Sequence, residues 1–172
     1  MTGDDSLEEN FLISPELTEN LAVRQVVSAA ARSLARSEQC RASLERKLLQ
    51  KEFSPETVKV ALDYLESKNY LDDARYASSW IRNHCAFKPQ GRIRLLRELT
   101  SRGVKKTLAE NAIRDYFISI PEESLCEEAF KKAASKKKDP QKILKSLADS
   151  GFSYSMIQKI FKNNKEGLNG TN

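Results

Sequence analysis

The chain has 172 residues, of which 40% are hydrophobic and 31% charged, and its formal net charge is +5 at pH 7. The hydrophobic residues form short periodic groups, and none approaches the roughly 20 apolar residues of a membrane-spanning helix. The acidic start lacks the basic-then-apolar layout of a secretory signal. These features argue against a membrane or secreted protein and predict a cytoplasmic location.

The cysteines and the histidine do not form a recognisable chemical site. Cys40, Cys85 and Cys126 are odd in number and widely separated, and His84 is the only histidine. Such spacing suggests neither a disulfide framework nor a zinc module. A Gly-rich phosphate loop and a nucleophile elbow are also missing from the sequence. We therefore expect buried or half-buried thiols, no metal or other cofactor, no catalytic residue and no enzymatic activity.

The charge is distributed unevenly along the chain. Residues 1–20 contain six acidic residues and no Lys or Arg, so the remaining residues carry a formal charge of +11. A positive surface suits a nucleic-acid backbone or an acidic protein, and charge alone does not choose between them. Residues 1–18 also lack sustained periodicity, and we interpret them as an acidic, flexible leader.

Residues 19–69 are predicted to form a first three-helix unit. Apolar residues at helical spacing begin at Leu21, and a second amphipathic stretch follows Ser37, which we predict to be its N-cap. Ser54 and Pro55 have the pattern of a cap followed by proline at the first helical position, where its missing N–H costs nothing. The third helix of this unit is expected to begin there.

Residues 70–119 are predicted to form a second unit whose first helix begins at two aspartates. Asp72 and Asp73 stand where carboxylates can accept the exposed N–H groups of a helix start, and Arg75 is placed to pair with one of them. Tyr76 and Trp80 share the apolar stripe of this helix. We expect Trp80 to pack in the core rather than to stack on bases.

Glycines are expected to punctuate the second and third units. Gly91 breaks the helical pattern before the second helix of residues 70–119, and Gly103 suits the left-handed conformation that ends that helix. Residues 120–163 form the third predicted unit, with a second cap-then-proline pair at Asp139 and Pro140. Residues 164–172 are predicted to be a flexible tail.

The junctions reveal an internal repeat. Residues 47–53, 98–104 and 146–152 superpose, so that Gly103 lies 51 residues after Glu52 and 48 residues before Gly151. A period near 50 is typical of tandem helical modules that bury part of their apolar faces on one another. The sequence therefore predicts an all-α fold, an elongated, curved array of three tandem three-helix repeats with about nine helices. A left-handed Glu52 would cost about 1 kcal/mol relative to glycine.

Each unit carries basic residues that we predict to form a binding surface. The first unit has Arg41, Arg46, Lys47 and Lys51, the second has Arg92, Arg94, Arg97, Arg102, Lys105 and Lys106, and the third has Lys136, Lys137 and Lys138, with Lys131, Lys132, Lys142 and Lys145 nearby. The plain alternative is a set of solvated helix faces. If the units stack regularly, these residues line one track that matches a filament or a nucleic-acid backbone.

The stretch from Leu65 to Val104 resembles the RecX family, the regulatory proteins of the bacterial recombinase RecA. The matching segments are residues 70–73, 75–77, 80–82, 91, 94–95, 98–99 and 102–104, with residues 36–37, 44, 47–48, 51 and 53 upstream. The resemblance covers residues 26–117, and the last third matches only as a repeat. The family has three such repeats and commonly has glycine where this chain has Glu52.

The resemblance implies a regulator that binds the RecA–DNA filament along its helical groove. It further implies a monomer that modulates, and most often inhibits, recombinase ATPase, strand exchange and SOS co-protease activity, with weak or indirect contacts to single- and double-stranded DNA. One alternative is an independent helix-turn-helix DNA-binding protein, although no unit shows a convincing set of base-reading side chains. Another is a helical scaffold for an acidic protein.

Overall fold

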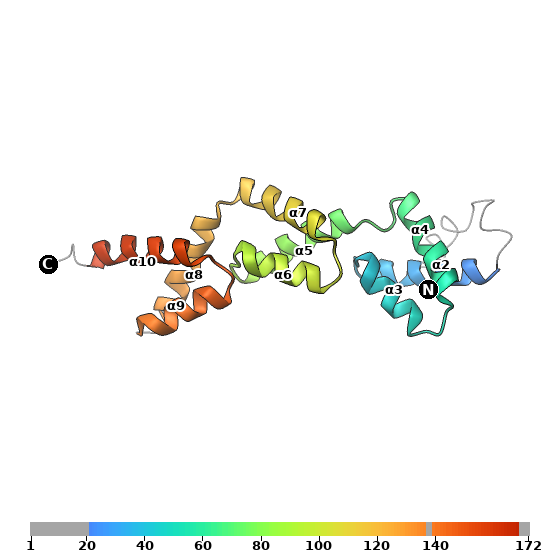
Figure 1. Ribbon diagram of the computed structural model, residues 1–172, viewed down its shortest axis with the longest axis horizontal. Coiled ribbons are helices and arrows are strands. Elements are labelled where there is room, and N and C mark those ends of the chain that lie inside the picture. The colour runs from blue at the N-terminus through green and yellow to red at the C-terminus, as the bar shows by residue number, and fades with distance from the viewer. Residues whose placement is uncertain (1–20, 137–138, 169–172) are drawn as a thin grey trace, which may run out of the picture. The chain divides into compact units, whose positions relative to one another are not determined.

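The computed structural model describes residues 21–136 and 139–168, and within these ranges it contains nine helices and no strand (Figure 1). The all-α repeat fold is thereby confirmed, whereas the elongated, curved outline stays a prediction. The predicted leader, Lys137 and Lys138 lie outside the described residues. The helices are α2 (Leu21–Arg36), α3 (Arg41–Leu49), α4 (Pro55–Ser67), α5 (Asp73–Phe87), α6 (Arg92–Ser101), α7 (Lys106–Ser119), α8 (Glu122–Ala134), α9 (Pro140–Asp149) and α10 (Tyr154–Leu168).

The chain divides into two compact units. The first contains the residues up to Tyr76 together with Arg102–Val104, and the second contains Ala77–Ser101 and the residues from Lys105 onward. Helix α5 therefore begins in the first unit and continues in the second. Helix α10 extends through Leu168, into the segment that the sequence pattern assigned to the tail. The division into three repeats with boundaries near residues 70 and 120 stays a prediction.

The core of the first unit is built from one apolar face of each of α2, α3 and α4. Val26 and Val27 of α2, Leu48 of α3, and Leu62 and Leu65 of α4 are all at most 1% exposed. Their three- and four-residue spacings place them on a single side of each helix, as the sequence pattern predicts. Burial of each aliphatic side chain contributes about 1.5–3 kcal/mol to folding.

Of the helix starts predicted at Ser37, Ser54 and Asp139, two are confirmed and one is wrong. Ser54 accepts a hydrogen bond from the Thr57 N–H at 3.3 Å, and Asp139 accepts one from the Gln141 N–H at 2.9 Å. Ser37, however, is not the N-cap of α3, because the helix begins at Arg41 and Cys40 occupies the cap position without a side-chain cap bond. A carboxylate far along the chain supplies that cap instead, as described below.

The start of α5 is capped as predicted, but Arg75 pairs differently. Asp72 accepts the N–H groups of Ala74 at 2.8 Å and Arg75 at 3.1 Å. The Arg75 guanidinium pairs with Glu38 at 2.5 Å and donates to the Asn69 and Tyr70 carbonyls. The predicted pair with an aspartate is therefore wrong, because the two aspartates already accept backbone N–H groups.

Trp80 has the predicted core role. Its side chain is 8% exposed, and its ring stacks on that of His84 with centroids 3.7 Å apart. Tyr76, one helical turn earlier, is 9% exposed. The imidazole of His84 is thus a packing group on this face of α5.

Left-handed residues end the second helix of each predicted repeat. The φ angles are 65° at Glu52, 97° at Gly103 and 86° at Gly151. In the last of these turns the Gly151 N–H donates to the Ala148 carbonyl at 2.9 Å, and in the first the Glu52 N–H donates to the Leu49 carbonyl at 3.0 Å. The structure confirms that Glu52 adopts the left-handed conformation that glycine adopts in the other two turns.

We expect Glu52→Gly to stabilise the protein by about 1 kcal/mol, because glycine removes the steric cost of the left-handed backbone. The measurement is urea and thermal unfolding followed by circular dichroism. Glu45→Gly is the matched control, since Glu45 is an exposed residue inside α3, where glycine costs about 1 kcal/mol. A melting temperature for Glu52→Gly below that of the parent protein contradicts the strained turn.

Candidate functional site

The N-terminus of α3 is held by residues much later in the chain. The Arg41 N–H donates to Asp73 Oδ1 at 2.7 Å, and Cys40 Sγ donates to the Arg102 carbonyl at 3.3 Å. A Cβ on Gly103 would overlap the side chain of Ala42, so the left-handed turn lies directly against the start of α3. These contacts lie within the first compact unit.

The N-terminus of α6 is held in the same way within the second unit. Glu122 Oε1 accepts the Arg92 N–H at 2.8 Å. The Gly91 N–H donates to the Ser150 carbonyl at 2.9 Å, and the Ile93 N–H donates to the Gly151 carbonyl at 3.2 Å. The first N–H groups and last C=O groups of helices have no partner inside their own helix, and here the start of α6 and the end of α9 satisfy one another.

Gly91 and Gly151 are both required for this approach. A Cβ on Gly91 would lie 2.6 Å from the Phe152 nitrogen and overlap the Gly151 carbonyl. A Cβ on Gly151 would overlap the backbone of Arg94, and the φ of 86° adds strain for any other residue. Two backbones therefore meet where the sequence pattern indicated only a helix break and a helix end.

Four of the predicted binding arginines take part in these structural contacts. Arg41 pairs with Asp63 at 2.7 Å and with Glu66 at 2.6 Å. The four are Arg41, Arg92, Arg94 and Arg102. These four arginines connect elements of the fold. The sequence pattern did not distinguish this structural role from a role in binding a partner.

Arg92 and Arg94 have their guanidinium groups engaged beside the α6 junction. Arg92 Nε lies 3.4 Å from Glu122 Oε2, and its guanidinium lies 4.9 Å from the centre of the Phe117 ring. Arg94 donates to the Asp149 carbonyl at 3.0 Å and pairs with Glu98 at 3.5 Å. Both side chains therefore connect α6 to its neighbours.

The other predicted basic residues that the structure describes are exposed. Lys106 pairs with Glu110 across one helical turn at 3.7 Å, an exposed contact worth a few tenths of a kcal/mol. Lys137 and Lys138 lie outside the described residues. The exposed set within the described ranges is Arg46, Lys47, Lys51, Arg97, Lys105, Lys106 and Lys136.

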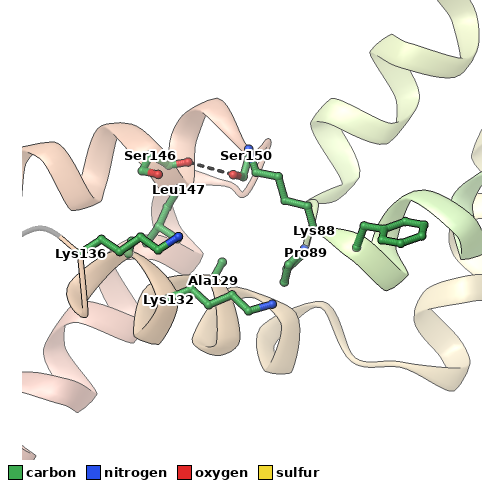
Figure 2. Close-up of a pocket in the computed structure, with 10 residues that line it drawn as sticks. Lys88, Pro89, Ala129, Lys132, Lys136, Ser146, Leu147 and Ser150 are labelled. Atoms are coloured by element: carbon green, nitrogen blue, oxygen red, sulfur yellow. Dashed lines mark hydrogen bonds between the residues drawn. The ribbon is translucent and has the colours of Figure 1, made fainter.

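A basic pocket lies between α8 and α9 in the second unit. Its volume is about 430 Å³, and we call it the α8–α9 pocket. Figure 2 shows Lys132 and Lys136 on one side and Ser146 and Ser150 on the other, with Lys88 entering from the segment after α5. Of its lysines, only Lys132 and Lys136 belong to the basic sets recognised in the sequence. The complete lining is Phe87, Lys88, Pro89, Ala129, Lys132, Ala133, Lys136, Ser146, Leu147 and Ser150.

A second basic pocket lies between α2 and α3 in the first unit. Its volume is about 380 Å³, and we call it the α2–α3 pocket. Arg36, Lys47 and Lys51 supply its cationic groups, and Ser33 and Ser37 supply hydroxyls. Arg36 was not among the predicted binding residues, because the other cations of the pocket, Lys47 and Lys51, lie more than ten residues later in the chain.

Two family models match the chain. The model for the first three-helix domain of RecX matches residues 28–65, and the model for the second three-helix domain matches residues 72–113. The regulatory protein RecX of Treponema pallidum is 34% identical over 138 residues, which are 80% of this chain and 84% of that protein. The chain belongs to the RecX family.

Other RecX proteins agree with this assignment. The regulatory protein RecX of Pseudomonas tolaasii is 32% identical over 135 residues, covering 74% of this chain and 83% of its own length. The crystal structure of RecX from Lactobacillus salivarius superposes with a TM-score of 0.73 at 22% identity, covering 83% of this chain and 96% of that one. At this identity, the superposition shows a shared fold. None of the helices in the described ranges of this RecX family member could cross a membrane.

Burial controls the chemistry of the three thiols. Cys40, Cys85 and Cys126 are free and buried, as predicted. Burial raises the pKa of each thiol, and for Cys126 the combined effect of burial and the nearby carboxylates of Glu122, Glu127 and Glu123 raises the pKa to about 11. Burial and a hydrogen bond with Cys85 likewise raise the pKa of Tyr116 to about 12. These thiols are therefore packing groups that stay protonated at neutral pH.

We expect Glu122→Ala to destabilise this RecX family member by about 1–2 kcal/mol, because it removes the cap of α6 and the negative charge at the helix N-terminus. Glu123→Ala is the matched control, since the pair of Glu123 with Lys159 at 2.8 Å is exposed and its loss should cost about 1 kcal/mol or less. Urea unfolding measures both variants. Equal losses would show that the Glu122 contact does not carry the junction.

Stability should fall in alkali as Cys126 titrates. The pKa of this thiol is about 11 in the folded chain against an ordinary value of 9.0, so between these pH values the unfolded chain binds fewer protons than the folded one. The thiol's contribution is fully present below pH 9 and is lost as the pH rises through the folded pKa.

Cys126→Ala should therefore flatten the pH dependence of the unfolding free energy by on the order of 1 kcal/mol across that window. The measurement is urea unfolding of the variant and the parent protein from pH 7 to pH 11. All other titrating groups are present in both proteins, so the difference between the curves isolates Cys126. Curves that remain parallel throughout would contradict the raised pKa.

Proposed function

We propose that this RecX family member is a non-enzymatic regulator that binds the RecA–DNA filament along its helical groove. It lowers recombinase ATPase activity, strand exchange and SOS co-protease activity. The observation that carries this proposal is the family match over two consecutive three-helix domains, to proteins named as regulatory. The protein works in the cytoplasm as a monomer, and its contacts with DNA are weak compared with its contacts with the filament.

The distribution of cations supports a filament as the target. Exposed basic residues occur at Lys47 and Lys51 in the first unit and at Arg97, Lys105 and Lys136 in the second. Each exposed charge contributes little by itself. A filament repeats the same surface, so several weak contacts made at once increase the overall affinity through a high effective concentration. Binding should therefore be much tighter to the filament than to free recombinase.

The proposal is tested by co-sedimentation with preformed RecA–DNA filaments across a salt series, together with recombinase ATPase rates. We expect association at moderate salt, a lower ATPase rate and weaker binding as salt increases. Absence of both association and ATPase change at moderate salt contradicts the proposal. A sequence-specific footprint on duplex DNA without recombinase would favour the helix-turn-helix alternative.

A double variant sharpens this test. Arg97→Gln/Lys105→Gln removes two exposed charges outside both pockets and should weaken filament binding several-fold. Arg82→Gln/Arg114→Gln is the matched control, because it removes the same charge from exposed positions outside the predicted binding sets. Equal effects of the two double variants would show that net charge, and not the predicted surface, controls binding.

A further inference from the structure

The α2–α3 pocket and the α8–α9 pocket occupy the same position in two repeats. Both lie between the first and second helices of their repeat. When Glu52 is aligned with Gly151, the lining residue Leu48 corresponds to Leu147 and Lys51 corresponds to Ser150. The first helices agree too, since residues 29, 33 and 36 line one pocket and residues 129, 133 and 136 line the other. The fold has therefore formed the same pocket twice.

Trp80 occupies the corresponding position in the middle repeat. It precedes Gly103 by 23 residues, as Ala29 precedes Glu52 by 23 and Ala129 precedes Gly151 by 22. The Trp80 ring is buried and stacks on His84 at 3.7 Å. Ala29 and Ala129 are much smaller than Trp80, so the space that an indole ring would occupy stays empty at these two positions. The two pockets thus follow from the small residues Ala29 and Ala129.

The linings of both pockets are cationic and contain no carboxylate. The α8–α9 pocket has Lys88, Lys132 and Lys136, and the α2–α3 pocket has Arg36, Lys47 and Lys51. Lys132 pairs with Glu128 at 2.7 Å, whereas the other five form no ion pair within the described ranges. The Ser150 hydroxyl already donates to the Ser146 carbonyl at 2.9 Å, so the charged donors that the pockets offer a ligand are the Lys and Arg side chains. This chemistry suits phosphate groups.

An exposed aromatic residue adds a second feature to the α8–α9 pocket. Phe87 lines it and is 88% exposed, although a phenylalanine side chain gains free energy on burial. It directly precedes Lys88. Aromatic rings next to cationic grooves are characteristic of single-stranded nucleic-acid binding, because bases stack on the ring while phosphates meet the cations. The acidic side chains of a protein partner have no flat surface that could stack on the Phe87 ring.

We propose that each pocket binds backbone phosphates of single-stranded DNA, and that Phe87 stacks on a base beside the α8–α9 pocket. The inference deepens the proposed function, on which it rests for the choice of DNA as the nucleic acid. It assigns direct DNA contacts to two places in the chain. The proposal assigns no phosphate site to the middle repeat, because the buried Trp80 ring occupies the corresponding position there.

The first test measures binding of the full chain to a fluorescent oligothymidylate by anisotropy between 50 and 200 mM salt, without recombinase. Lys88→Gln/Lys136→Gln should reduce the slope of log affinity against log salt by about 1.4, since each single-strand phosphate contact contributes about 0.7. Lys59→Gln/Lys162→Gln is the matched control, because it removes the same charge from exposed positions outside both pockets and outside the predicted binding sets. Equal slope changes in the two double variants overturn the proposal.

The second test fills the pocket without changing any charge. Ala129→Trp copies the middle repeat and should reduce the salt slope by at least 0.7, one phosphate contact. Ala134→Trp is the control, since Ala134 is exposed on α8 and lies outside the pocket. Circular dichroism and melting curves establish that each variant is folded. Unchanged oligothymidylate binding by folded Ala129→Trp overturns the proposal, and if that variant does not fold, the lysine variants decide it.

The third test separates stacking from charge. Phe87→Ala should weaken oligothymidylate binding about fivefold or more with an unchanged salt slope, and Phe87→Tyr should retain binding. Pocket-dependent binding to polyglutamate without binding to oligothymidylate would identify an acidic protein as the partner and overturn the proposal. These measurements contain no recombinase, so their failure is distinct from a failure of the filament ATPase assay.

Discussion

The structure depends on how the N-termini of α3 and α6 are satisfied. Each of these helices starts with N–H groups that lack partners in their own helix and with the positive end of the helix dipole. Asp73 and Glu122, the first residues of α5 and α8, accept the N–H groups of Arg41 and Arg92 at 2.7 and 2.8 Å. The same kind of contact, a carboxylate at the start of one helix that accepts an N–H at the start of another, therefore occurs at two points along the chain.

This mode of assembly changes the interpretation of the basic residues. Arg41, Arg92 and Arg94 place their guanidinium groups on carboxylates or carbonyls of neighbouring elements, where they stabilise the fold. The cations left for a partner are mostly lysines, such as Lys51 and Lys136, which stay exposed. A filament or a nucleic acid would therefore contact a surface with fewer cations than the composition suggests, and their positions matter more than their number.

The three repeats differ in the side chain at one corresponding position of their first helix. Ala29 and Ala129 line pockets in two of the repeats, whereas the corresponding residue of the middle repeat is Trp80, whose buried ring stacks on His84. The side-chain volume at this one position thus differs between the two repeats that have a pocket and the repeat that buries a ring. This divergence is compatible with an unchanged backbone plan, because the left-handed turns at the ends of α3, α6 and α9 are retained.

The sequence by itself determined the features that depend on neighbouring residues. The helices, the caps at Ser54 and Asp139 and the apolar stripe that contains Trp80 follow from patterns within a few positions of the chain, whereas the left-handed conformation of Glu52 was settled by the structure. Only the tertiary structure decided which arginines are engaged and where the pockets lie. It also replaced the predicted cap at Ser37 by a carboxylate 32 residues beyond Arg41. Such contacts join residues whose separation in the sequence carries no periodic signal, so they emerge only when the helices pack.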